Sequence, residues 1–441
     1  MRRPQVTAGS KLAALALMAM ILATAVSPRI RLGGSEAQLV DLRLQDLILI
    51  PVMAYLLFTR RRDGRSPARY LLRPLLPALL LGIVAVTLTV TLLHPEVSVL
   101  RRVGFAGRTL ELFVLVMAVA GLYWRAGDRA LKCTLRAFHL AAIANTLWVL
   151  YQAATGNIGT LFGSTIGDAV ESYGPKLLGE PSAFGTGQFF AITAAVGLAE
   201  IRADKTRRLT GWLMVAAGFT GATLAESRIS MGAILAGVVL LLTFSRIKGQ
   251  VLNPFRLTMM VLLGTAAALV VVPRLGGRIS VEDLEYGVTG RADTIWSVLL
   301  QESADHPFVG LGAGGLVGDL RSEAHNIYLR AVLDFGWFIG ALFIAVFVVA
   351  LVRAYRESKN ATTAEARLGA TLAFFALTSV LISGFVQDAL TAVTSSHLTI
   401  LTVGIFAATY ASSCQNPEKH PPTARGGRRV LTVQGSLNGR A

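Results

Sequence analysis

The chain has 441 residues, of which 53% are hydrophobic and only 15% are charged. Soluble domains usually carry about a quarter charged residues, so this composition excludes a soluble globular protein and indicates a membrane protein. The net charge of +16 comes from short basic clusters between apolar runs. That distribution is typical of membrane-protein loops and not of a nucleic-acid-binding surface.

The sequence gives no sign of a metal or cofactor site. Its two cysteines, Cys133 and Cys414, are too few and too far apart for a disulfide framework. His, Cys and carboxylate residues do not occur together at metal-ligand spacing. We therefore expect a protein without a metal or other cofactor, and without a nucleic-acid partner.

About twelve apolar runs approach the length of roughly 20 residues that a helix needs to cross a bilayer. We therefore predict an all-α, polytopic bundle formed by one transmembrane domain, residues 1–411, followed by a basic disordered tail, residues 412–441. The expected spans lie near residues 12–30, 44–59, 75–93, 109–124, 133–151, 183–201, 209–225, 229–245, 257–273, 326–352, 366–384 and 394–411.

The first run has two interpretations. Arg2 and Arg3 precede it and the small residues Ala23 and Ala25 lie near its end, which is also the pattern of a cleaved signal peptide. We favour a retained span that continues to Ile30, because it makes the charges of the later loops consistent.

Loop charges predict the orientation. With the N-terminus inside, most of the 42 Lys and Arg residues fall on cytoplasmic segments, as the positive-inside rule requires. We therefore expect both termini to be cytoplasmic. A long outer loop, residues 274–325, separates the ninth and tenth spans.

Within that loop, residues 291–305 have the spacing of an amphipathic helix, which we expect to lie on the bundle or at the membrane surface. Pro307 ends this helix, and a glycine-rich strip follows. The apolar face comprises Ala292, Ile295, Trp296, Leu299 and Leu300.

Arginines gather on the predicted outer side. A buried arginine is costly unless it pairs or faces a polar cavity, and guanidinium groups suit phosphate oxygens. Two interpretations remain open: a cationic pocket, or ion pairs with Glu226, Glu323 or Asp334 and contacts with headgroups. The arginines concerned are Arg228, Arg291, Arg321 and Arg330.

His325 precedes the tenth span. A histidine near its ordinary pKa can accept a proton from an attacking hydroxyl, so His325 is a candidate general base. The alternative is that it caps or packs the helix start.

The region of roughly residues 226–340 resembles the hallmark region of the superfamily of O-antigen ligases and Wzy O-antigen or exopolysaccharide polymerases. The resemblance rests on the Ser227-Arg228 turn and on Gly290, Arg291, Trp296, His306, Pro307, Gly310, Gly312, Ala324, His325, Asn326, Tyr328, Leu329, Gly336 and Gly340.

This resemblance implies a metal-independent, inverting glycosyltransferase of the bacterial inner membrane that moves an undecaprenyl-diphosphate-linked oligosaccharide. Residues 274–325 would then form its large periplasmic loop. The resemblance also implies that His325 is the base, that Asn326 supports it, and that Arg228 and Arg291 contact diphosphate. Arg321 and Arg330 have no clear counterpart in the family, so their assignment rests on the physical argument alone.

Glu180, followed by Pro181 and Ser182, resembles an element of the polymerases, and a buried Glu180 would bind sugar hydroxyls or orient an arginine. The alternative is a simple helix start with Pro181 at the first helical position. The element favours a polymerase, with an acceptor glycan as partner, over a ligase, which attaches polymer to lipid A-core. The lipid bilayer and other polysaccharide-assembly proteins are further expected partners. A secondary transporter and a peptidoglycan polymerase remain alternatives.

Overall fold

The computed structural model describes residues 8–26, 29–32, 40–58, 99–156, 161, 175–179, 183–244, 290, 292–308, 310–311, 325–385 and 393–414. These residues are almost entirely helical. The main helices are α1 (Ala8–Val26), α2 (Leu44–Phe58), α5 (Val99–Ala126), α6 (Ala130–Thr155), α7 (Ala183–Ala203), α8 (Arg208–Leu224), α9 (Arg228–Phe244), α12 (Ser297–Asp305), α13 (Ile327–Asn360), α14 (Ala364–Ser383) and α15 (Val393–Cys414).

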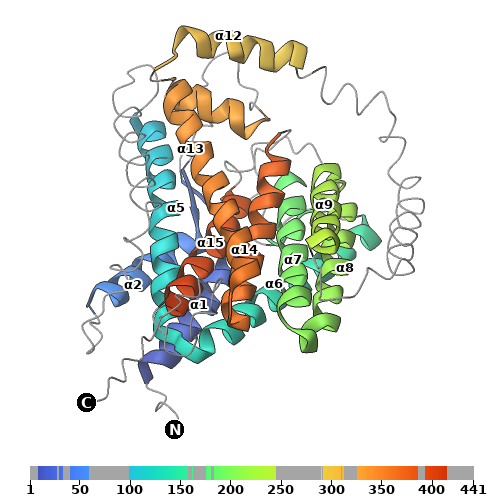
Figure 1. The fold of residues 1–441 in the computed structure, drawn as a ribbon. Helices are drawn as coiled ribbons and strands as arrows, with labels where there is room; N and C mark the ends of the chain where they lie inside the picture. Colours follow the sequence, from blue (N-terminus) through green and yellow to red (C-terminus); the bar gives the residue numbers. More distant parts are fainter. Residues whose placement is uncertain are drawn as a thin grey trace, which may run out of the picture.

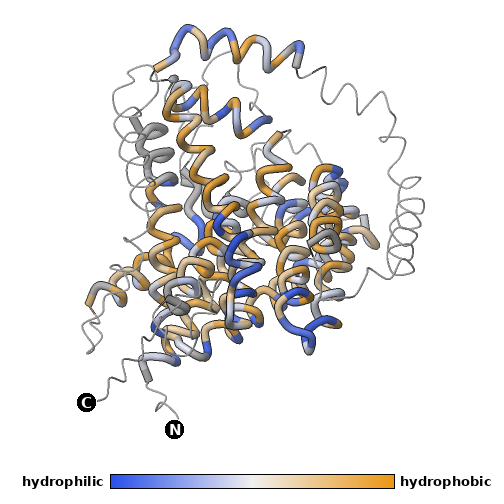
Figure 2. Tube along the Cα trace, viewed as in Figure 1, coloured by the Kyte–Doolittle hydropathy of each residue, from blue (hydrophilic) through white to orange (hydrophobic). Residues whose placement is uncertain are grey.

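Every predicted apolar run that falls in the described residues is a helix, and the runs near 75–93 and 257–273 lie outside them. Within the described ranges, five helical segments are long and apolar enough to cross a membrane: Gly9–Val26, Ala130–Thr155, Phe184–Ala203, Ile327–Asn360 and Ala364–Ser383. The hydropathy of the traces in Figure 2 agrees, since apolar residues dominate the helices and the short turn between α7 and α8 is hydrophilic. The chain therefore has the character of a membrane protein.

Two predicted boundaries were wrong. The first helix ends at Val26 and does not continue to Ile30, because Pro28 disfavours helical continuation. Residues Arg29–Leu32 instead form β1, which pairs antiparallel with β2 (Val40–Arg43). At the other end α15 extends to Cys414, so the predicted tail begins three residues too early, and residues 415–441 lie outside the described part.

Helix α7 occupies the centre of the bundle, where it packs against α6, α8, α9, α14 and α15. Small residues allow this close packing, as they do in many membrane proteins. A Cβ atom on Gly211 of α8 would lie 2.6 Å from the carbonyl oxygen of Gly197 on α7. The side chains of α7 are consequently almost all buried, so polar groups on it face protein and not lipid.

Helix α13 breaks near its start. Gly336 has φ 76° and ψ 169°, so residues 327–335 form a separate short segment before the long helix continues. In Figure 1 this first segment runs across the bundle beneath α12, and the remainder descends along it. Because of this break, the first segment of α13, which follows His325, has a different direction from the rest of the helix.

Candidate active site

Three helices begin at one end of the bundle, which we call the His325 end. Phe184 in the first turn of α7 packs against Ile327 at the start of α13 and Val380 near the end of α14. Three residues further along α7, Gly187 lies so close to Ser227, just before α9, that a Cβ atom would overlap its side chain. The first turns of α7 therefore join the starts of α9 and α13, which are far apart in sequence.

Asn326 caps α13 and anchors it to α14. Its side-chain oxygen accepts hydrogen bonds from the backbone amides of Tyr328 at 2.9 Å and Leu329 at 3.0 Å. Its Nδ2 donates to the carbonyl oxygen of Phe385 at 3.1 Å. An N-cap satisfies amides that the helix itself leaves without partners. Asn326 was predicted to support His325, and this capping gives it a way to fix the neighbouring backbone.

His325 is half-buried and has a left-handed backbone, with φ 48°. The residues after it are held tightly, since the amide of Ile327 donates to the carbonyl of Gly384 at 2.8 Å. The hydroxyl of Tyr328 likewise donates to the carbonyl of Leu381 at 2.8 Å. Non-glycine residues rarely adopt positive φ, and such strain is frequent at functional sites.

Arg228 is the first residue of α9 and is half-buried. Within the part of the chain that the structure describes, its guanidinium group forms no hydrogen bond or ion pair. The positive end of a helix dipole disfavours a cation and attracts an anion. An arginine at this position that has no partner among the described residues therefore favours a negatively charged ligand.

The turn before Arg228 is also strained. Glu226 has φ 53°, and it and His325 are the non-glycine residues with positive φ among those described. The hydroxyl of Ser227 donates to that of Ser230 at 2.8 Å, and both side chains are buried against α7. The two strained residues, Glu226 and His325, thus each lie two residues before the start of a helix, α9 and α13 respectively.

Arg330 behaves differently from Arg228. Its Nε atom lies 2.9 Å from Oδ2 of Asp334, one turn later in α13, and both side chains are largely buried. This contact agrees with the ion-pair interpretation and satisfies Arg330 within its own helix. The other predicted site residues, Glu180, Arg291 and Arg321, lie outside the described residues.

The segment before Glu180 is nevertheless described, and it is buried although it is not helical. Gln152 of α6 exchanges two hydrogen bonds with the backbone of Lys176, of 2.7 and 3.1 Å. Asn145 accepts from the amide of Leu178 at 3.2 Å, and Thr186 accepts from that of Leu177 at 3.2 Å. Irregular backbone inside a membrane bundle requires partners of this kind. The sequence prediction gave Gln152, Asn145 and Thr186 no role. The two amide side chains lie within an apolar run or at its end, and such a position is a signal of a buried hydrogen bond.

The predicted amphipathic helix is confirmed over residues 292–305, formed by a π-helical turn, Ala292–Trp296, and α12. Leu299 is fully buried against Leu329 and Leu333 of α13, whereas Leu300, predicted on the same face, is largely exposed. The Nε1 of Trp337 donates to the carbonyl of Ser303 at 3.2 Å. The helix therefore rests on the first segment of α13.

The chain after α12 docks on the break in α13. Gly310 has φ 65°, and a Cβ atom there would lie 2.5 Å from the backbone nitrogen of Gly336. The amide of Leu311 donates to the carbonyl of Leu333 at 2.7 Å. These contacts couple the loop to the segment that follows His325.

A polar cluster that the sequence prediction missed joins α2, α5 and α15. Nη1 of Arg108 lies 3.0 Å from Asp46, and Nε2 of His397 lies 3.0 Å from Oε1 of Glu111. His397 is almost fully buried. The cluster contains opposite charges, so it can bind these three helices together without a ligand. Among the described residues no group of His, Cys, Asp and Glu side chains could hold a metal ion.

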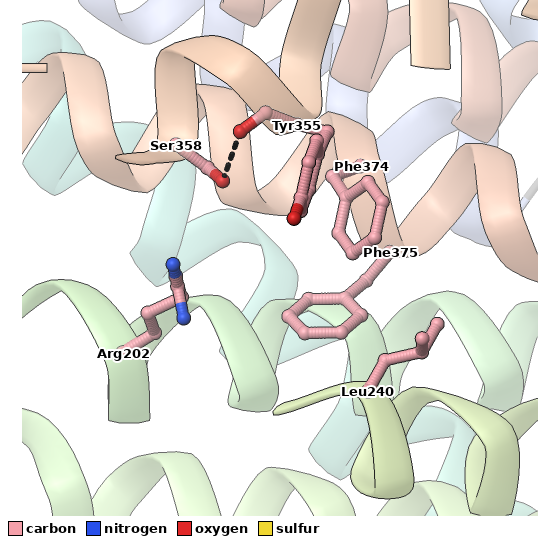
Figure 3. Close-up of a pocket in the computed structure, with 6 residues that line it drawn as sticks. All are labelled: Arg202, Leu240, Tyr355, Ser358, Phe374 and Phe375. Atoms are coloured by element: carbon pink, nitrogen blue, oxygen red, sulfur yellow. Dashed lines mark hydrogen bonds between the residues drawn. The ribbon is translucent and has the colours of Figure 1, made fainter. Parts of the chain in front are cut away.

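A small hollow lies at the opposite end of the bundle. Figure 3 shows Arg202 from the end of α7 and Tyr355 and Ser358 from the end of α13 around it, with Phe374 and Phe375 of α14. Because α7 and α13 start at the His325 end, this hollow is separate from the candidate active site.

Comparison with known proteins gives no direct assignment. No protein-family model matches the chain, and no curated protein matches it.

Proposed function

We propose that the protein is a membrane glycosyltransferase that moves an undecaprenyl-diphosphate-linked glycan onto a sugar hydroxyl at the outer face of the inner membrane. The observation that carries this proposal is that Arg228 and His325 both lie at the same end of the bundle, beside the starts of α9 and α13. Arg228, whose guanidinium group has no partner among the described residues, and His325, whose backbone is strained, supply the two groups that such a transfer needs, one for the diphosphate and one for the attacking hydroxyl.

In the proposed reaction, His325 takes the proton from a hydroxyl of the acceptor glycan. The hydroxyl oxygen forms a bond to the anomeric carbon of the donor sugar, while the bond from that carbon to the diphosphate oxygen breaks with inversion. Arg228 and the start of α9 stabilise the negative charge that develops on the leaving undecaprenyl diphosphate. Stabilisation of developing charge by fixed groups is usually the largest catalytic contribution.

The proposed topology has twelve spans, with both termini cytoplasmic and the His325 end facing the periplasm. Helix directions support it, because α7, α9 and α13 start at this end while α14 finishes there. Reporter fusions at residues 170 and 300 should be periplasmic, and fusions at residues 65, 205, 360 and 425 cytoplasmic. A cytoplasmic result at residue 300 would exclude the mechanism, since the lipid-linked donor is used on the opposite side.

Between the two activities we favour a polymerase over an O-antigen ligase, because of the resemblance around Glu180. Gel analysis of surface polysaccharide from a deletion strain separates them. Loss of a polymerase leaves single repeats on lipid A-core, and loss of a ligase leaves unattached lipid-linked polymer. The activity itself is tested with purified protein, lipid-linked donor and acceptor glycan in the presence of a chelator. Failure of wild-type protein to elongate or transfer the glycan would contradict the proposal.

A further inference from the structure

A buried polar strip lies between α7 and α14 at the His325 end. It consists of Gln188 on α7 and of Ser379 and Ser383 on α14, whose exposed fractions are 0%, 4% and 0%. The hydroxyl of Ser379 donates to Oε1 of Gln188 at 3.4 Å. Ser383 follows Ser379 by four residues and so lies on the same face of α14, one turn nearer to the helix end.

Two hydrogen-bonding groups of this strip are unused. Within the described residues, Nε2 of Gln188 and the hydroxyl of Ser383 have no hydrogen-bond partner. Two other hydroxyls of α14 are satisfied by their own helix: Thr371 donates to the carbonyl of Arg367 at 2.6 Å, and Thr378 to that of Phe374 at 2.7 Å. Buried polar groups are normally paired, and leaving one unpaired is unfavourable. Ser383 therefore differs from Thr371 and Thr378 of the same helix, whose hydroxyls are paired.

The position of the strip connects it to the candidate active site. Ser383 ends α14, and the next residue, Gly384, accepts a hydrogen bond from the amide of Ile327. Gln188 lies one turn after Phe184, which packs on Ile327 and Val380. The strip therefore lies beside the junction of α7 and α14 against which Ile327, two residues after His325, is packed.

We propose that Gln188 and Ser383 bind hydroxyl groups of the sugar ring that is attached to the diphosphate. An amide and a hydroxyl are neutral and can both donate and accept, which matches sugar hydroxyls. A diphosphate would instead require a cation, and Arg228 supplies one directly after Ser227, which packs on Gly187 of α7. This inference rests on the proposed function and assigns the sugar-recognising part of the same site.

Gln188→Met tests the inference, because methionine has a similar length and removes the amide. Binding of two probes to the purified full-length protein is compared: the lipid-linked repeat extracted from cells that lack the protein, and undecaprenyl diphosphate without sugar. We expect about ten-fold weaker binding of the lipid-linked repeat, as for loss of a hydrogen bond, and unchanged binding of undecaprenyl diphosphate. The midpoint of thermal unfolding should change little, because the variant loses only the long 3.4 Å hydrogen bond from Ser379 together with an amide nitrogen that has no partner among the described residues.

Gln152→Met is the matched control. Gln152 is equally buried, but both ends of its amide bond the backbone of Lys176, so this variant should lower the unfolding midpoint. Ser383→Ala is an independent variant and should lower affinity for the lipid-linked repeat in the same selective way.

Each remaining outcome has one meaning. Equal losses for both probes would overturn the sugar assignment in favour of a diphosphate contact. Unchanged binding in both Gln188→Met and Ser383→Ala, with wild-type protein binding both probes, would overturn the inference but leave the proposed function intact. Failure of wild-type protein to bind either probe would overturn both.

Discussion

The two ends of the bundle differ in the hydrogen bonds and ion pairs of the polar groups that the structure describes, and in backbone strain. At the end opposite His325, the fully buried Glu200 is paired, since it lies 3.1 Å from His139 and 3.4 Å from Arg207. Arg125 of α5 donates to the carbonyls of Tyr55 and Leu56 and so caps the end of α2. At the His325 end, Arg228 has no described partner, and two non-glycine residues have positive φ.

This difference indicates a division between stability and function. Matched charges and caps lower the energy of the folded state, whereas strained backbone and unsatisfied groups raise it. Strained positions persist only where the surrounding structure holds them, and here Asn326 and the contacts of α7 provide that support. Variants at the two ends should therefore affect different measurements.

The largest effect is expected from His325→Ala. Loss of a general base typically lowers turnover by 10²–10⁴-fold. Binding of lipid-linked donor should remain nearly normal, because the proposed role of His325 is in proton transfer. Turnover and binding are measured separately on purified protein. Near-normal turnover in well-folded protein would show that His325 is structural, and Glu180 would be the next candidate base.

Arg228→Ala should have the next largest effect, on both donor binding and turnover, because Arg228 is proposed to contact the diphosphate before and during bond cleavage. Arg228→Lys should restore only part of the activity, since lysine keeps the charge but loses the planar fork. The measurement is donor affinity together with turnover at saturating donor. Full recovery with lysine would argue against a forked contact.

Asn326→Ala and Thr363→Ala form a matched pair. Both residues cap helices, Asn326 at the His325 end and Thr363 at the opposite end, where it accepts from the amide of Ala366. Loss of either cap should cost about 1 kcal/mol of unfolding free energy. Only Asn326→Ala should also lower turnover, because it releases the backbone next to His325. Equal turnover in both variants would remove Asn326 from the site.

The smallest effect is expected from Glu200→Gln. The variant keeps the shape of the side chain but loses the charge that faces His139 and Arg207. Since those partners are partly exposed, we expect a destabilisation of only about 1 kcal/mol, measured by thermal unfolding. Turnover per folded molecule should not change. A selective loss of turnover would contradict the proposed division between the two ends.

The sequence predicted the helices well because apolar length is a local property. It also predicted the amphipathic loop helix, since the spacing of Ile295, Trp296 and Leu299 records which face is buried. It did not predict the β1–β2 pair, the break at Gly336 or the central position of α7. These features depend on partners distant in the chain, as when Gly310 approaches Gly336.

The candidate site was predicted in part. His325, Asn326 and Arg228 carry local signals, a helix start and a tight turn, and the structure places them at one end of the bundle. Gln188 was not identified, because an amide within an apolar run does not reveal whether its hydrogen bonds are satisfied. That distinction from Gln152 exists only after the helices are packed.

The buried segment formed by residues 175–179 also bears on how the protein assembles in the membrane. The backbone amides of this segment donate hydrogen bonds to side chains on α6 and α7. These bonds can replace the segment's hydrogen bonds to water only when both helices are in place. Before that moment its peptide groups must stay hydrated at the membrane surface. We therefore expect this segment to enter the membrane last, after α6 and α7 have already crossed the bilayer.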